Sequence, residues 1–196
     1  MTDFVIENDT LVRFRGERTD VTVPAFIKKI LPSAFYHKIE IERITLPEGL
    51  REIGDGAFRL CTTVTELTVP DSVTSIGSWA FAGCYHLERI TLPRGLTVLS
   101  RGLFEGCYAL SSIDLPEGLL EIRESAFSRC SSLSRIVLPA SLSAIEWHAF
   151  SECRDLEEIV CTERVAALLS GNVVSRGFLF SGATISRREP PRITII

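Results

Sequence analysis

Proline, phenylalanine and cysteine recur along this chain at a fixed interval of 23 residues, and no other feature constrains the fold as strongly. The prolines in register are Pro24, Pro47, Pro70, Pro93, Pro116 and Pro139. The phenylalanines are Phe35, Phe58, Phe81, Phe104, Phe127 and Phe150, and the cysteines are Cys61, Cys84, Cys107, Cys130 and Cys153. A constant period in the twenties predicts a solenoid in which each unit forms one coil and buries its apolar face only against its neighbours.

Residues 110–132 show how one unit is expected to fold. Three apolar residues at nearly alternating positions precede the proline, namely Leu110, Ile113 and Leu115. This pattern predicts a short strand with its apolar side chains turned inward. Pro116 has no amide hydrogen and therefore suits the end of the strand, where a turn begins. Further along, Ala126 and Phe127 are expected to form a tight helical turn that places the phenylalanine in the core.

The unit LxxIxLPxxLxxIxxxAFxxCxx resembles the BspA-like class of leucine-rich repeats, also called the Treponema-type class. The match covers about residues 21–162, and residues 4–16 resemble the hairpin that often precedes the first coil in this family. The resemblance implies a mainly β, right-handed solenoid with a concave parallel sheet. Many members of the family are bacterial surface proteins implicated in adhesion or host binding, so it also implies protein recognition. It transfers no catalytic residue.

We expect three parts in the chain: an N-terminal β-hairpin cap over residues 1–20, a solenoid of about six coils over residues 21–162, and a C-terminal cap over residues 163–196. A solenoid needs caps because its terminal coils would otherwise expose the core. Within the C-terminal part, residues 163–170 predict a short helix that stops at Gly171, and the apolar residues 178–180 and 193–196 are expected to cover the last coil. The alternative is that this tail docks a further domain.

The outward-facing side chains of the expected strands form the main candidate binding surface. The column two residues before each proline contains Thr45, Thr68, Thr91 and Asp114; the column four residues before it contains Arg43, Glu66, Arg89 and Arg135; the third contains Glu42 and Glu88. A purely structural interpretation is available, because threonine favours strands and alternating charges can pair between neighbouring coils. The functional interpretation is a mixed-charge platform on the concave face that binds a protein or peptide.

Exposed aromatic residues are a secondary candidate. Tyr85 and Tyr108 share one column and should stack on adjacent coils, whereas Trp79 and Trp147 interrupt polar columns on the other wall. Tyrosine and tryptophan are enriched at interface hot spots. The alternative, which we favour, is that these rings cover the corners of the coils.

Composition excludes several classes of function. The net charge of −4 argues against a nucleic-acid groove, which needs a clustered basic excess, and no apolar run approaches the roughly 20 residues that span a bilayer. The first residues show no basic segment followed by an apolar stretch, so we expect no signal peptide. The sequence as it stands predicts a cytoplasmic protein, or a cell-surface protein if the chain is an excised domain.

The cysteines and histidines do not suggest chemistry. Cysteines in register on adjacent coils lie farther apart than a disulfide prefers, and a line of thiols is not a tetrahedral zinc site, so buried free thiols are expected. His37, His86 and His148 fall in different columns, and the chain has no catalytic or phosphate-binding motif. We expect no cofactor and no metal. The favoured function is a non-enzymatic protein-interaction module; the alternatives are the ligand-binding domain of a larger bacterial adhesin and, less favoured, a hydrolase with an unrecognised site.

Overall fold

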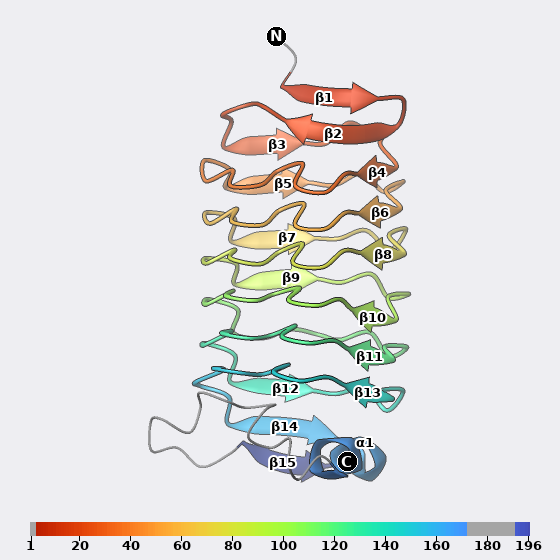
Figure 1. The fold of residues 1–196 in the computed structure, drawn as a ribbon, viewed down its shortest axis with the longest axis vertical. Helices are drawn as coiled ribbons and strands as arrows, with labels where there is room; N and C mark the ends of the chain where they lie inside the picture. Colours follow the sequence, from red (N-terminus) through yellow and green to blue (C-terminus); the bar gives the residue numbers. More distant parts are fainter. Residues whose placement is uncertain (1–2, 172–190) are drawn as a thin grey trace.

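The computed structural model describes residues 3–171 and 191–196, and its coils stack into an elongated solenoid (Figure 1). Each regular coil supplies one short segment to a first wall and another to a second wall, and turns connect the two. Strands dominate the described residues, with one short helix near the C-terminal end. The mainly β solenoid expected from the 23-residue period is therefore confirmed.

The first wall is the one expected to carry the binding surface. Its strands are β3 (Asp20–Thr22), β5 (Arg43–Thr45), β7 (Glu66–Thr68), β9 (Arg89–Thr91), β12 (Arg135–Val137), β14 (Glu158–Cys161) and β15 (Arg192–Ile195). The paired strands of the repeats are parallel and 23 residues apart, as Val21 opposite Ile44 and Leu67 opposite Ile90 show, whereas β14 and β15 pair across 34 residues. In each three-residue strand the middle side chain is buried and the two flanking side chains are exposed.

Hydrogen bonding divides the first wall into three groups, which are β3–β5, β7–β9 and β12–β14–β15. The expectation of a strand before Pro116 is wrong, because residues 110–116 form no strand. This coil carries Ser111, Ser112 and Asp114 at its three outward positions, where no other coil has more than one Ser or Asp, and these side chains compete for backbone hydrogen bonds. Ile113 nevertheless turns inward and stays buried.

The second wall begins with the expected N-terminal hairpin. Strand β1 (Phe4–Glu7) pairs antiparallel with β2 (Thr10–Phe14), and β2 then pairs in parallel with the first strand of the second wall. The remaining strands of this wall are β4 (Lys29–Ile30), β6 (Glu52–Ile53), β8 (Ser75–Ile76), β10 (Val98–Leu99), β11 (Glu121–Ile122) and β13 (Ala144–Ile145). Because β2 continues the wall, the hairpin covers the N-terminal face of the first coil (Figure 1).

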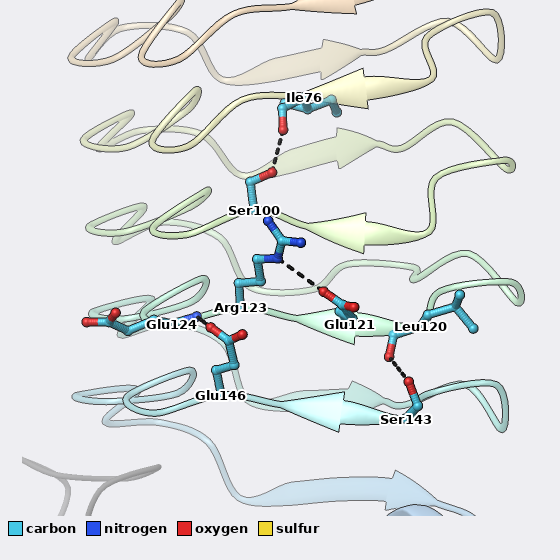
Figure 2. A network of polar contacts seen from close by, with 8 residues as sticks. All are labelled: Ile76, Ser100, Leu120, Glu121, Arg123, Glu124, Ser143 and Glu146. Atoms are coloured by element: carbon cyan, nitrogen blue, oxygen red, sulfur yellow. Dashed lines mark hydrogen bonds and ion pairs between the residues drawn. The ribbon is translucent and has the colours of Figure 1, made fainter.

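Side chains bridge successive coils of the second wall (Figure 2). The ladder is interrupted between β8 and β10, and there the Ser100 hydroxyl donates a hydrogen bond of 2.5 Å to the Ile76 carbonyl. Two coils further on, the Ser143 hydroxyl donates to the Leu120 carbonyl at 3.1 Å. The polar groups of this wall therefore hold neighbouring coils together.

The segment after each second-wall strand is a series of turns, so the expected helical turn at Ala-Phe is wrong. Its amide groups point alternately within the coil and to the next coil: Ala57 donates to the Gly54 carbonyl at 3.2 Å, whereas Phe58 donates to the Ala80 carbonyl at 2.8 Å. Two residues of each segment adopt a left-handed backbone. They are Ser33, Gly56, Trp79, Gly102, Ser125 and His148 in one column, and His37, Leu60, Gly83, Gly106, Arg129 and Glu152 in the other. A helix would need negative φ throughout.

The core consists of aromatic rings and thiols in register. Adjacent phenylalanine rings from Phe14 to Phe150 stack with centroids 4.9–5.8 Å apart. Beside this column, each thiol from Cys61 to Cys153 donates a hydrogen bond of 3.0–3.3 Å to a phenylalanine carbonyl of the preceding coil. All six cysteines are buried and free, which confirms that expectation.

The C-terminal end closes with a helix and a strand. Helix α1 (Glu163–Gly171) confirms the expected helix, and it buries Val165 and Leu169 against the core. Strand β15 pairs in parallel with β14, with Ile193 opposite Ile159. The apolar residues 178–180, expected to cover the last coil, lie outside the described residues.

Candidate functional site

The first wall presents the candidate residues as three exposed columns. Thr45, Thr68 and Thr91 occupy the outward position at the end of β5, β7 and β9, and Asp114 takes the same position in the coil that lacks a strand. Arg43, Glu66, Arg89 and Arg135 begin their strands, and Glu42 and Glu88 directly precede Arg43 and Arg89. The structure thus gathers these side chains on one face, although they lie far apart in the sequence.

The charged residues of this face pair within the hydrogen-bonded strand groups. Arg43 binds Asp20 of the preceding coil, with Nε 2.5 Å from Oδ1, and this hydrogen bond lowers the pKa of the Asp20 carboxyl. Arg89 likewise binds Glu66. Ion pairing between charges on neighbouring coils is therefore confirmed for Arg89 and Glu66. Arg43, in contrast, pairs with Asp20 and not with Glu66.

A third ion pair lies at the C-terminal end of the wall. Arg135 Nε lies 2.9 Å from Glu158 Oε2, and Arg192 of β15 binds the other oxygen of the same carboxylate at 2.9 Å. Hydrogen bonds from Thr194, Arg192 and Arg135 lower the pKa of Glu158 to about 2. Arg192 and Thr194 were not identified from the sequence, because residues 191–196 lie outside the 23-residue repeat.

Three hollows open along the first wall, and two of them lie where neighbouring coils lack backbone pairing. One of about 330 Å³ lies between β5 and β7, beside Thr45 and Thr68, and another of about 380 Å³ lies between β9 and residues 114–117. A third, of about 660 Å³, extends over four coils and is lined by Glu42, Arg43, Thr63, Thr65, Glu66, His86, Glu88 and Ala109. The first wall is consequently an uneven surface with shallow polar hollows.

Tyr85 and Tyr108 stack on adjacent coils as expected. Their ring centroids are 5.1 Å apart and their planes differ by 18°. The side chains remain 38% and 44% exposed, and they border a small hollow of about 180 Å³ beside Gly83 and Gly106. Exposed rings of this kind can contribute to binding, but each ring also covers a face of the other.

The two tryptophans differ in burial and in contacts. Trp79 is half-buried over Gly102, its Nε1 donates to Glu105 Oε2 at 3.2 Å, and the Arg101 guanidinium lies 5.2 Å from its ring centroid. Trp147, in contrast, is 62% exposed. These contacts support the interpretation of Trp79 as a residue that covers a coil corner.

The thiols are buried in the core, away from this surface, and the three histidines lie on separate coils. Burial raises the pKa of the Cys61, Cys107 and Cys153 thiols to about 12, which leaves them protonated and unreactive. The ring of His86 faces the Thr62 carbonyl, with Nδ1 2.6 Å from the oxygen. Within residues 3–171 and 191–196, no three His, Cys, Asp or Glu side chains are grouped to hold a metal. In the same residues, no helix is long and apolar enough to cross a membrane.

A parallel stack of 23-residue coils, with inward leucine and isoleucine columns and an exposed strand face, defines a leucine-rich repeat protein. A profile of the BspA type leucine rich repeat region matches this chain in six copies, over residues 14–107 and 52–171. The chain therefore belongs to the BspA-type leucine-rich repeat family.

Three solved structures illustrate the likeness. A leucine rich cell surface protein from Faecalibacterium prausnitzii is 28% identical, with a TM-score of 0.60 over 81% of this chain. A leucine-rich repeat protein from Bacteroides ovatus is 27% identical, with a TM-score of 0.63 over 83%. The leucine-rich repeat protein of T. pallidum is 29% identical, with a TM-score of 0.52 over 77%. This chain spans 52%, 57% and 62% of these three chains. No curated protein sequence matches it.

Proposed function

We propose that this protein is a non-enzymatic interaction module that binds a protein or peptide along its first wall. The observation that carries the proposal is the availability of the hydroxyl groups there. Among the described residues, the hydroxyls of Thr45, Thr68 and Thr91 have no hydrogen-bond partner. Second-wall hydroxyls such as those of Ser100 and Ser143 are instead bonded to neighbouring coils. The hydroxyls of Thr45, Thr68 and Thr91 are therefore available to a partner, whereas those of Ser100 and Ser143 are occupied.

A second candidate function is that of the ligand-binding domain of a larger bacterial cell-surface protein. It is supported by the Faecalibacterium relative, which is described as a cell surface protein and of which this chain spans only 52%. The same face would bind the ligand in either case. We assign no catalytic role, because His37, His86 and His148 lie on separate coils and the sequence has no catalytic motif.

Paired double substitutions test the proposal. The variant Thr68→Arg/Thr91→Arg places two long cations on the first wall, and the control Thr74→Arg/Thr97→Arg places the same two cations on exposed positions of the second wall. Each variant, verified as folded by circular dichroism, serves as bait for lysate of the source organism and for candidate host surface proteins. We expect the native chain and the control to capture the same protein and the first-wall variant to lose it.

Equal capture by all three baits would place the binding site elsewhere and contradict the proposal. Loss with the control alone would assign binding to the second wall. Capture of a partner by the native chain and the control alone, with a dissociation constant measurable by calorimetry, would establish the first wall as the recognition surface.

A further inference from the structure

Resting on the proposed function, we infer that the partner segment carries two cationic side chains about 10 Å apart, which the carboxylates of Glu42 and Glu88 receive on the first wall. Both residues line the hollow of about 660 Å³ that extends over four coils. Both are exposed, and they belong to the same outward column. The inference follows from the charge that remains on this surface once its internal ion pairs are formed.

The charge balance favours a cationic partner. The first four coils of the wall present four carboxylates, from Asp20, Glu42, Glu66 and Glu88, and only two guanidinium groups, from Arg43 and Arg89. Arg43 is paired with Asp20. Arg89 binds Glu66 and lies 3.8 Å from Glu88, so one cation serves two carboxylates.

Glu42 has no ion-pair partner within 4.0 Å among the described residues. A net excess of two negative charges therefore remains on these coils, with Glu42 unpaired and Glu88 sharing the Arg89 guanidinium with Glu66. Asp114 adds a further exposed carboxylate on the next coil along the wall.

The spacing of the two carboxylates identifies the kind of segment that fits. They lie two coils apart, with the uncharged Thr65 on the coil between them. The phenylalanine rings that precede these three positions in the sequence follow one another at 4.9 and 5.7 Å, so two coils amount to about 10 Å. A polyproline II segment repeats every three residues with a rise of about 3.1 Å per residue, so its side chains i and i+3 lie about 9.3 Å apart on one face. In a β-strand, residues i and i+2 lie only about 6.8 Å apart. The match favours Lys-x-x-Lys in an extended segment that runs along the solenoid axis.

A metal ion does not fit the same pair of carboxylates. Oxygen ligands of calcium lie about 2.3–2.6 Å from the ion, so two carboxylates about 10 Å apart cannot share one. Among the residues that the structure describes, no three acidic, histidine or cysteine side chains are grouped closely enough to hold a metal ion. Two separate ammonium or guanidinium groups satisfy the two carboxylates independently.

Fluorescence anisotropy with synthetic peptides tests the inference. The probe is fluorescein-labelled Pro-Pro-Lys-Pro-Pro-Lys-Pro-Pro, with one control peptide that has adjacent lysines and another that has glutamates in place of lysines. The protein variants are E42Q, E88Q, the double variant and the control E7Q, which removes an exposed carboxylate on β1. We expect each single variant to weaken binding of the probe about threefold and the double variant about tenfold, in line with exposed ion pairs.

The expected pattern also includes unchanged binding by E7Q, weaker binding of both control peptides and weaker binding at high salt. Unchanged affinity of the double variant, or no binding of the probe by the native chain, would overturn the inference. The proposed function would survive the failure of this inference if the Thr68→Arg/Thr91→Arg variant still lost the protein that the native chain captures. Equal affinity for the adjacent-lysine peptide would overturn the two-point spacing.

Discussion

At the scale of single residues, left-handed backbone conformations decide the shape of each coil. Only four of the twelve positions in the two left-handed columns are glycine: Gly56, Gly83, Gly102 and Gly106. The others include bulky residues such as Leu60, Trp79 and Arg129. A left-handed conformation costs roughly 1–2 kcal/mol for a residue with a β-carbon, so stacking between coils must hold these residues in place. The glycines in register were the one sequence signal of these columns.

Three glycine-to-alanine substitutions separate the cost of strain from the cost of a clash. Gly118 has open space around it and no left-handed φ, so Gly118→Ala should change the free energy of unfolding by less than about 0.5 kcal/mol. Gly106 has φ +73° and no close neighbour, so Gly106→Ala should cost about 1 kcal/mol through strain alone. Gly102 combines φ +59° with the overlying Trp79 ring, so Gly102→Ala should cost about 2–4 kcal/mol.

Urea unfolding of the three variants, followed by circular dichroism, measures this order. Equal losses for Gly106→Ala and Gly102→Ala would show that Trp79 does not pack closely over Gly102. A neutral Gly106→Ala would contradict the left-handed assignment itself.

At the scale of secondary-structure elements, the two ends of the solenoid close in different ways. The hairpin at the N-terminal end extends the second wall, whereas β15 at the C-terminal end extends the first wall (Figure 1). Strand β15 lies beyond the repeat and is attached by backbone pairing with β14 and by the bonds from Arg192 and Thr194 to Glu158. Glu158 is therefore the side chain that most directly fixes this strand.

Removal of the Glu158 charge should release β15 and leave the coils folded. The pKa of Glu158 is lowered to about 2 from an ordinary value of 4.5, so the carboxylate stabilises the folded state above about pH 4.5. That contribution is lost as the pH falls through 2. Glu158→Gln should therefore lower the protection of residues 192–195 against deuterium exchange at pH 7. On acidification the wild type should lose the same protection, measured relative to the intrinsic exchange rate at each pH.

Hydrogen exchange followed by mass spectrometry measures both effects, with Glu157→Gln, at the exposed neighbouring position, as the control. Unchanged protection of residues 192–195 in Glu158→Gln would show that backbone pairing alone holds β15.

At the scale of the whole molecule, columns in register make the solenoid one continuous structure. The phenylalanine stack passes through every coil from Phe14 to Phe150, and the thiol hydrogen bonds cross each coil boundary from Cys61 to Cys153. No coil has a core of its own, so a change in one column is felt by both neighbours. The buried thiols also couple the stability of the whole stack to pH.

Alkaline conditions should destabilise the protein through these thiols. Burial raises the pKa of Cys61, Cys107 and Cys153 to about 12 and that of Cys84 and Cys130 well above the ordinary value of 9.0. Unfolding therefore releases protons above about pH 9, and stability falls as the pH rises toward 12. Each thiol should contribute about 1.4 kcal/mol per pH unit to this slope.

The double variant Cys107→Ala/Cys130→Ala isolates the contribution of two thiols to this slope. Titration of tyrosine and lysine is common to the variant and the wild type and therefore cancels in the comparison. The slope of the unfolding free energy between pH 9.5 and 10.5 should be about 2.7 kcal/mol per pH unit less steep than that of the wild type. Urea unfolding at several pH values measures it. Identical slopes would mean that the thiols ionise equally in the folded and unfolded protein.

The sequence by itself determined the repeat, the inward columns and the family. A coil of 23 residues cannot bury Ile113 or Phe127 alone, so the period already requires stacking, and stacking places Thr45, Thr68 and Thr91 side by side. Tertiary structure alone decided which neighbouring strands form ladders and which side chains form ion pairs. Arg43 pairs with Asp20 because β3 and β5 form a ladder, residues 110–116 form no strand, and β15 pairs with β14 across 34 residues of sequence. Such choices depend on small differences between competing hydrogen bonds, which a periodic pattern does not encode.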